Sequence, residues 1–235
     1  MNNIKENLEL LHEQINRILT SCGRNKEELK LLAVSKTFPI ETILDAYQCG
    51  QRMFGENRTQ ELLTKVPNAP KDCEWHLIGH LQKNKVRTAV ENAAWIHAVD
   101  SVQLITRIDR LAKELNKQPK LLLEVNISGE DSKFGLKPDK VEEVLTCYQS
   151  LKSACPCLGL MTIAPQNATS NELHKIFGDL RKLRDTLSTN TGMILPELSM
   201  GMSGDFKEAV EEGATIVRVG SAVFGHRDIE QKDEL

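Results

Sequence analysis

The chain has 235 residues, a formal net charge of −3, 27% charged residues and 40% hydrophobic residues. These proportions are typical of a globular protein, and they exclude a disordered chain and a broad basic surface for nucleic acid. The longest uninterrupted hydrophobic runs have four residues, as at 31–34, whereas a transmembrane helix needs about 20.

The first predicted element is an amphipathic helix over residues 1–23 that packs on the rest of the protein. Hydrophobic side chains recur in it at helical spacing, and Gly23 is suited to end it. Glu6, Glu9 and Glu13 interrupt the segment, so we do not expect it to be a secretory signal peptide.

Short β-rich runs alternate with helical stretches after this helix. Strands are predicted over 31–36, 53–56, 75–79, 95–100, 121–128, 157–163, 197–202 and 216–220. Helices are predicted over 40–50, 59–66, 102–116, 138–151, 171–187 and 205–213, with a shorter one between Gly79 and Trp95. Parallel neighbouring strands need such crossovers, so the pattern predicts an α/β fold, a single (β/α)₈ TIM barrel over 29–226. A doubly wound open sheet is the alternative, but its G-x-G-x-x-G fingerprint is missing.

Lys36 closes the first predicted strand, at the end of the barrel where active sites form. Strand parity puts Leu32, Val34 and Lys36 on one face, so Lys36 is expected to point into the barrel mouth. Partial burial there would lower the lysine pKa and favour Schiff-base chemistry. A lysine that extends to solvent from a strand end is the alternative.

The middle of the chain carries two smaller clusters. Lys83, Lys85 and Arg87 are expected to form a solvated basic face or a small anion site. Cys155 and Cys157 are the one close cysteine pair, and no further Cys/His cluster completes a metal site. Six cysteines are too sparse for a disulfide scaffold, so reduced thiols in a cytoplasmic protein are expected.

The last two predicted strands add an anion site. Arg218 shares the inward face of its strand, where a buried arginine needs an acceptor. Small residues follow both strands, and Asp205 with Glu208 is expected to cap the first of two helix N-termini. Two such N-termini after strands seven and eight are the usual phosphate site of a barrel. Opposite Lys36, they indicate a phosphorylated aldehyde as ligand, either pyridoxal phosphate or a sugar phosphate.

Five stretches of sequence resemble the pyridoxal phosphate homeostasis protein family (YggS/PROSC family). They are Ala33-Val34-Ser35-Lys36-Thr37, Phe54-Gly55-Glu56-Asn57-Arg58, Trp75-His76-Leu77-Ile78-Gly79-His80-Leu81-Gln82 with Asn84-Lys85, Gly159-Leu160-Met161-Thr162, and Leu198-Ser199-Met200-Gly201-Met202-Ser203-Gly204-Asp205 through Arg218-Val219-Gly220-Ser221. The resemblance covers the whole chain. It implies one barrel of the alanine-racemase N-terminal type that binds pyridoxal 5′-phosphate.

The resemblance also implies roles for individual residues. Lys36 would form the Schiff base, and Arg218 would face the pyridine nitrogen. The remaining cofactor-binding residues, with phosphate contacts from the serines and glycines, would be Asn57, His80, Met200, Ser203, Gly204, Gly220 and Ser221. Lys133, in the loop Ser132-Lys133-Phe134-Gly135, is a candidate second lysine.

An arginine at the ring nitrogen makes the cofactor a poorer electron sink, and Tyr47 and Tyr148 both lie in predicted helices away from strand ends. His80 remains as an acid/base candidate. We therefore expect a non-catalytic binding protein that serves pyridoxal phosphate homeostasis; the alternatives are a weak amino-acid racemase or decarboxylase-like enzyme and a Schiff-base aldolase. The expected protein is a cytoplasmic monomer that contacts neither nucleic acid nor membrane and passes its cofactor to pyridoxal-phosphate-dependent apoenzymes.

One domain over 1–235 is expected, with a charged tail over 227–235. The tail ends in Lys232-Asp233-Glu234-Leu235, which spells the endoplasmic-reticulum retention address. Without a signal peptide the chain would not meet the receptor that reads this address, so no function is expected of it.

Overall fold

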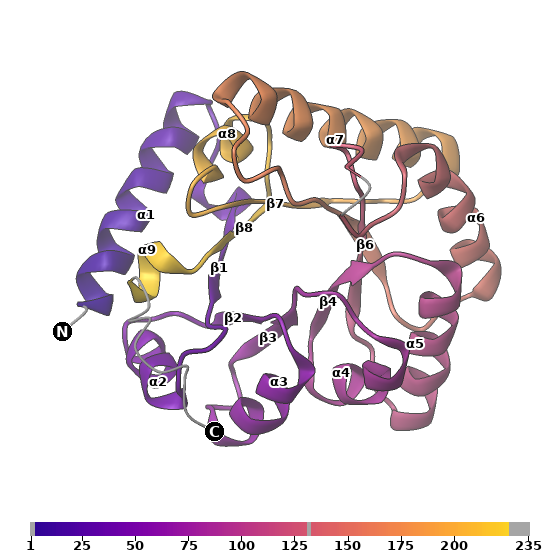
Figure 1. Ribbon diagram of the computed structural model, residues 1–235, viewed down its shortest axis with the longest axis horizontal. Coiled ribbons are helices and arrows are strands. Elements are labelled where there is room, and N and C mark those ends of the chain that lie inside the picture. Colours follow the sequence, from indigo (N-terminus) through magenta and orange to yellow (C-terminus); the bar gives the residue numbers. More distant parts are fainter. Residues whose placement is uncertain (1–2, 131–132, 226–235) are drawn as a thin grey trace.

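The described residues, 3–130 and 133–225 of a computed structural model, form a closed barrel of parallel strands in the order β1 to β8 (Figure 1). The strands are β1 Lys30–Val34, β2 Met53–Glu56, β3 Glu74–Leu77, β4 Trp95–Val99, β5 Lys120–Glu124, β6 Cys157–Met161, β7 Glu197–Met202 and β8 Ile216–Val219. The barrel closes where β1 pairs with β8, with Lys30 opposite Ile216. The predicted α/β barrel is therefore confirmed.

Helices surround the barrel and connect its strands (Figure 1). They are α1 Ile4–Ser21, α2 Ile40–Gln48, α3 Thr59–Lys65, α4 Val86–Asn92, α5 Val102–Leu115, α6 Val141–Leu151, α7 Ser170–Thr191, α8 Phe206–Glu211 and α9 Ser221–Phe224. Short 3₁₀ turns lie at Lys26–Glu28, Val66–Asn68, Lys83–Lys85 and Pro138–Lys140. None of the helices within the described residues is long and apolar enough to cross a bilayer.

Local chemistry explains where the longer helices begin and end. The Ser101 hydroxyl accepts a hydrogen bond from the Leu104 amide at the start of α5, and the helix ends at Asn116 in the left-handed conformation. At the start of α7, Thr169 and Glu172 form a reciprocal capping box. The predicted helix over 171–187 extends to Thr191, because Gly192 supplies the left-handed residue that ends it.

The N-terminal helix α1 packs along the barrel beside α8 and α9 (Figure 1). Its buried side chains recur at helical spacing: Ile4, Leu8, Leu11, Ile15 and Leu19. A hydrogen bond of 3.0 Å from Asn7 Nδ2 to the Val223 carbonyl joins α1 to α9. Gly23 follows the helix with a φ of +68°, as the sequence predicts.

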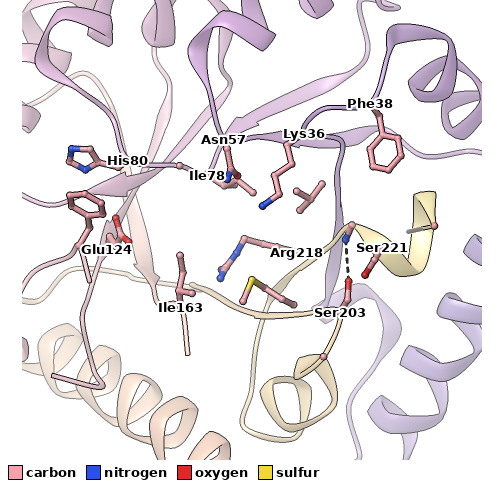
Figure 2. Close-up of a pocket in the computed structure, with 17 residues that line it drawn as sticks. Lys36, Phe38, Asn57, Ile78, His80, Glu124, Ile163, Ser203, Arg218 and Ser221 are labelled. Atoms are coloured by element: carbon pink, nitrogen blue, oxygen red, sulfur yellow. Dashed lines mark hydrogen bonds between the residues drawn. The ribbon is translucent and has the colours of Figure 1, made fainter. Parts of the chain in front are cut away.

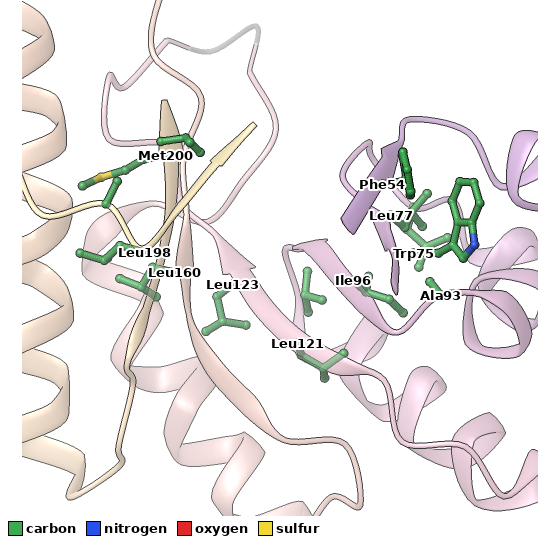
Figure 3. Packing of buried hydrophobic residues seen from close by; sticks show 14 of the residues in the cluster. Phe54, Trp75, Leu77, Ala93, Ile96, Leu121, Leu123, Leu160, Leu198 and Met200 are labelled. Atoms are coloured by element: carbon green, nitrogen blue, oxygen red, sulfur yellow. The ribbon is translucent and has the colours of Figure 1, made fainter. Parts of the chain in front are cut away.

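The core has an outer and an inner part, since alternate strand residues face opposite sides. The outer cluster lies between the strands and the helices and includes Phe54, Trp75, Leu123, Leu198 and Met200 (Figure 3). The inner cluster fills the barrel with Leu32, Val34, Ile78, Trp95, Ala98, Leu122, Met161 and Ile216. The parity predicted for Leu32 and Val34 is confirmed.

Several strands end earlier than their sequence predicts. The first ends at Val34, so the prediction that Lys36 closes it is wrong. A turn follows instead, with Phe38 N bonded to the Ser35 carbonyl and Thr37 at a φ of +69°. The fifth strand ends at Glu124 rather than at 128, and the chain then forms a loop. The predicted tail, including 232–235, lies outside the described residues.

Candidate functional site

A pocket of about 800 Å³ opens at the carboxyl ends of the strands (Figure 2). Its volume is in the range of small-molecule sites. Residues from both ends of the chain border it: Val34, Lys36, Phe38, Asn57, Ile78, Gly79, His80, Glu124, Phe134, Ile163, Met202, Ser203, Gly204, Arg218, Gly220, Ser221 and Gly225. The structure thus brings together every site residue that the sequence singled out for the cofactor except Met200.

Lys36 lies two residues beyond β1, and its side chain points into the pocket (Figure 2). Both neighbours in the turn are held by α3 and β2. The Ser35 hydroxyl donates to Glu56 Oε1 at 2.6 Å, and the Thr37 amide donates to Glu61 Oε1 at 2.6 Å. Both residues that flank Lys36 are therefore held in place by hydrogen bonds.

A buried ion pair, Lys65 with Glu56, lies beneath this turn. Lys65 Nζ donates to Glu56 Oε1 at 2.8 Å, to Glu61 Oε1 at 3.0 Å and to the Ser35 carbonyl at 2.9 Å. Burial raises the pKa of Glu56 to about 7, against the hydrogen bonds from Lys65 and Ser35. The sequence contained Glu56 in a family-like motif, but nothing in it indicated Lys65 as the partner.

The loops after β7 and β8 meet at one end of the pocket. The Gly220 amide donates to the Ser203 hydroxyl at 3.3 Å, and Ser221 begins α9 beside it (Figure 2). Position 201, near the end of β7, requires a glycine, because its φ is +92° and a Cβ there would lie 2.6 Å from the Cβ of Ala209. Hydroxyl and amide groups from two loops thus converge as an anion site requires.

The predicted capping pair at this end is wrong. Asp205 occupies the N-cap position of α8 without capping it, and its carboxylate accepts a hydrogen bond from the Met202 amide instead. Glu208 accepts from the Ser170 hydroxyl at 2.9 Å. The tight turn after Gly201 directs the Asp205 carboxylate back toward its own loop.

Arg218 borders the pocket from inside the barrel and is 3% exposed. Its Nη1 donates to Ser199 Oγ at 2.7 Å and its Nη2 donates to the Thr162 carbonyl at 2.8 Å. Burial lowers the pKa of the guanidinium to about 10, while the charges of Asp205 and Glu124 raise it. The side chain therefore stays cationic at neutral pH, and the predicted inward orientation is confirmed.

Glu124 is a pocket residue that the sequence analysis missed. It is 6% exposed, and its Oε2 has no hydrogen-bond partner among the described residues. Burial, together with the charge of Asp100, raises its pKa to about 7, while Arg218 lowers it. The sequence signal for this residue was a single carboxylate directly after the hydrophobic run 121–123. It was overlooked because the strand was predicted to continue to 128, which placed Glu124 in the middle of the strand rather than at its end.

The opposite rim of the pocket is aromatic. His80 stacks on Phe134 with 4.0 Å between the ring centroids, and Asn57 borders the pocket nearer to Lys36 (Figure 2). Lys133 precedes Phe134 but does not border the pocket; its Nζ lies 3.2 Å from Glu130 and 3.4 Å from the Ile163 carbonyl. The structure thus places His80 and Asn57 at the site and Lys133 outside its lining.

Met200 does not lie at the pocket. It is fully buried in the outer cluster, on the same face of β7 as Leu198 (Figure 3). The pairing between β7 and β8 shifts between Ser199 and Met202, at the positive φ of Gly201. This irregularity breaks the alternation and brings Met202 to the pocket instead.

The two tyrosines lie away from the pocket. Tyr47 donates its hydroxyl to Asp72 at 2.8 Å, and Tyr148 donates to the Cys155 carbonyl at 2.8 Å. Among the described residues, no group of three or more His, Cys, Asp or Glu side chains is placed to hold a metal ion.

Comparison with known proteins adds a second line of observation. The family model described as alanine racemase, N-terminal domain, matches residues 6–228. Two curated relatives are named pyridoxal phosphate homeostasis protein. That of Aquifex aeolicus (strain VF5) is 41% identical over 226 residues, which are 96% of this chain and 99% of the relative. That of Vibrio alginolyticus is 42% identical over 236 residues, which are 97% and 99%.

A solved structure shares the fold as well as the sequence. PipY of Synechococcus elongatus PCC7942, with PLP bound, is 42% identical to this chain with a TM-score of 0.80. The match covers 90% of this chain and 100% of that one. The similarity is thus not confined to the residues around the pocket.

Proposed function

Since the chain belongs to the pyridoxal phosphate homeostasis protein family, we propose that it binds pyridoxal 5′-phosphate and takes part in the intracellular homeostasis of this cofactor. One observation carries the proposal: an amine, a guanidinium and a cluster of hydroxyl and amide groups border one cavity. The similar protein PipY holds the same cofactor in its solved structure. When bound, the cofactor would supply an aldehyde that captures primary amines.

The residues of the pocket fit the parts of this molecule. Lys36 is the amine that would hold the aldehyde covalently, because it enters the pocket from the β1 turn. Arg218, a buried donor, would face the ring nitrogen. The phosphate would lie at the end formed by Ser203, Gly204, Gly220 and Ser221, while Asn57 and His80 border the ring.

We propose that this protein holds the cofactor without turnover of amino acids. A cationic Arg218 keeps the ring nitrogen unprotonated, which weakens carbanion stabilisation. Both tyrosines are engaged elsewhere, so neither supplies a proton at the pocket. His80 and Glu124 are the acid/base groups that the alternative, a weak racemase, would have to use.

The test of binding uses purified protein and added pyridoxal phosphate. We expect a visible absorbance band, and borohydride reduction should then leave the cofactor on Lys36 in a peptide map. Lys36→Ala should lose both signals, and Lys133→Ala, the control outside the pocket lining, should keep them. A Lys36→Ala variant with the full band and a modified peptide elsewhere would contradict the assignment.

The test of turnover uses the loaded protein with L-alanine in deuterated water. We expect spectral change without deuterium at the Cα position, because amine exchange needs no Cα–H cleavage. A well-placed acid/base group contributes typically 10²–10⁴-fold, and neither tyrosine supplies one at the pocket, so exchange should stay near background. Rapid Cα–H exchange that Glu124→Gln abolishes would instead support the racemase.

The partners we propose are the cofactor and the pyridoxal-phosphate-dependent apoenzymes that receive it, with the protein acting as a cytoplasmic monomer. The cysteines fit the proposed cytoplasmic location, because thiols stay reduced in that compartment. All six cysteines are free, and burial raises the pKa values of Cys155 and Cys157 to about 11 and about 12. Light scattering at micromolar concentration measures the molecular mass, and a dimer mass would contradict this proposal.

A further inference from the structure

A line of hydrogen bonds crosses the barrel interior from the pocket to the opposite end. Arg218 Nη1 lies 2.7 Å from Ser199 Oγ, which lies 3.0 Å from Nδ1 of His97. His97 Nε2 lies 2.9 Å from His76 Nδ1, and His76 Nε2 lies 3.2 Å from Glu74 Oε1. The three middle side chains are fully buried, and the line ends at the first residue of β3.

The chemistry of the two ends fixes the direction of every bond in this line. Arginine has no acceptor, so Arg218 donates to Ser199. An ionised carboxylate has no donor, so His76 Nε2 carries the proton that it gives to Glu74. His76 Nδ1 is then an acceptor that needs a proton from His97 Nε2. His97 Nδ1 accepts in turn from the Ser199 hydroxyl.

The reverse direction fails at one end. It would place an unprotonated His76 Nε2 against the Glu74 carboxylate, and both atoms would be acceptors. A doubly protonated His76 would avoid this conflict, but burial lowers the pKa of His76 and lowers that of His97 well below its usual value. The His76 hydrogen bond lowers the pKa of Glu74 to about 2, and Trp95 Nε1 donates to the same oxygen at 2.9 Å.

We propose that four residues outside the pocket, which form a one-way hydrogen-bond relay, position Arg218 as a donor at the cofactor site: Ser199, His97, His76 and Glu74. Their importance for binding rests on the proposed function, whereas the direction of the relay does not. They are positioning residues, because the pocket lining does not include them.

The relay also helps to stabilise the positive charge of the buried Arg218 side chain. The Arg218 side chain is almost wholly buried, and its hydrogen bonds among the described residues go to the Ser199 hydroxyl and the Thr162 carbonyl rather than to a carboxylate. An isolated buried charge is unstable unless polar groups compensate it. The aligned bonds offer such compensation, since Ser199, His97 and His76 each turn an acceptor atom toward Arg218 and the line ends on the negative charge of Glu74.

The first test reads the relay directly, in the protein without cofactor. Nitrogen-15 NMR of the histidines should show His76 and His97 as neutral rings protonated at Nε2 at neutral pH. A ring protonated at Nδ1, or a cationic His76 at neutral pH, would overturn the proposal. This result stands whether or not the protein binds pyridoxal phosphate.

The second test separates positioning from packing at His97. His97→Gln can still accept at Oε1 and donate at Nε2, whereas His97→Leu cannot. We expect affinity for pyridoxal phosphate to fall about tenfold or more in His97→Leu and to stay within about threefold of the wild type in His97→Gln. A packing role would favour the apolar leucine, so equal affinities or a better leucine variant would overturn the proposal.

Two further measurements guard this comparison against misfolding. Affinity for inorganic phosphate should be the same in both variants, because the relay acts on Arg218 and not on the loops after β7 and β8. If His97→Leu does not fold, Glu74→Gln replaces it: an amide can also donate to His76 Nε2, so the direction is no longer fixed at this end, and affinity for pyridoxal phosphate should fall only if the rings reverse. Reversed rings with unchanged affinity, or weaker binding with both rings still protonated at Nε2, would overturn the proposal.

Discussion

At the scale of single residues, Ser203 and Ser221 approach the same end of the pocket from two different loops. A hydrogen bond to a charged group contributes roughly 1.5–3 kcal/mol. We therefore predict that Ser221→Ala lowers affinity for pyridoxal phosphate about ten- to a hundredfold, measured by absorbance titration. Affinity for pyridoxal, which lacks the phosphate, should not change, and Ser150→Ala on the exposed face of α6 is the control. Equal losses for both ligands would contradict the phosphate site.

A second residue-scale prediction concerns Glu124. Its pKa rises from 4.5 to about 7 on folding, so the folded protein binds the proton more tightly, and the free energy of unfolding falls as pH rises through this window. Glu124→Gln removes this effect. By linkage, the stability difference between Glu124→Gln and the wild type should shift in favour of the variant by about 2 kcal/mol from pH 5 to pH 8.

Urea unfolding at the two pH values measures this difference. Glu9→Gln, on the exposed face of α1, serves as the control and should show no such trend. A Glu124→Gln variant whose stability difference is the same at pH 5 and pH 8 would show that the carboxyl is not held in a desolvated site.

Side-chain direction was the part of the site that the sequence predicted best. Alternation along β1 and β8 turned Lys36 and Arg218 toward the pocket, although β1 ends two residues before Lys36. The same alternation would have excluded Met200, which faces outward with Leu198. Neither Glu124 nor the pair of His76 and His97 was identified from the sequence as site-related. Their roles depend on side chains from other strands, which the sequence alone does not place next to them.

At the scale of elements, the pair formed by Lys65 of α3 and Glu56 of β2 holds the turn that carries Lys36. Removing one partner of a buried ion pair typically costs about 3–5 kcal/mol. We predict a loss of this size in unfolding free energy for Lys65→Met, together with weaker covalent attachment of the cofactor. The double variant Lys65→Met/Glu56→Met should recover part of the stability but not the attachment.

The control is an exposed pair of the same chemistry on α7. Lys175 Nζ lies 2.7 Å from Asp179, and the lysine side chain is 78% exposed. Lys175→Met should cost at most about 1 kcal/mol and leave attachment unchanged. If both lysine variants lose similar stability, the buried pair has no special role.

Element boundaries were harder to predict than element types. Hydrophobic and β-branched residues continue past β5 through Ile127, so composition alone extended the strand to 128. The actual end is set by tertiary contacts: the Asn126 amide donates to the Leu136 carbonyl across the following loop. Where a local signal exists, as with Gly23 after α1, the predicted end is correct.

At the scale of the whole molecule, the barrel was predictable because eight β-rich runs alternate with helical stretches. The added helix α1 was predictable from its hydrophobic stripe, which the structure buries. We predict that Leu11→Ala, at 2% exposure, lowers the free energy of unfolding by about 2–5 kcal/mol. Leu10→Ala, on the same helix at 50% exposure, should change it by about 0.5 kcal/mol or less.

Urea denaturation midpoints compare the two variants under one set of conditions. Because α1 contacts α9, which begins at Ser221, the Leu11→Ala variant should also bind pyridoxal phosphate more weakly. Equal midpoints for the two leucine variants would mean that α1 packs less tightly on the barrel than its burial indicates.

The pairing of β1 with β8 has a consequence for how the protein is made. Lys36 lies in the loop that follows β1, and Arg218 lies in β8. These two sides of the pocket are therefore among the earliest and the latest parts of the barrel to be synthesised. A ribosome-bound chain that ends before residue 216 carries the lysine without the arginine or the second half of the phosphate end. Contacts between such distant residues form late and slow folding. The cofactor can therefore be taken up in full only by a chain that already includes β8 and the start of α9.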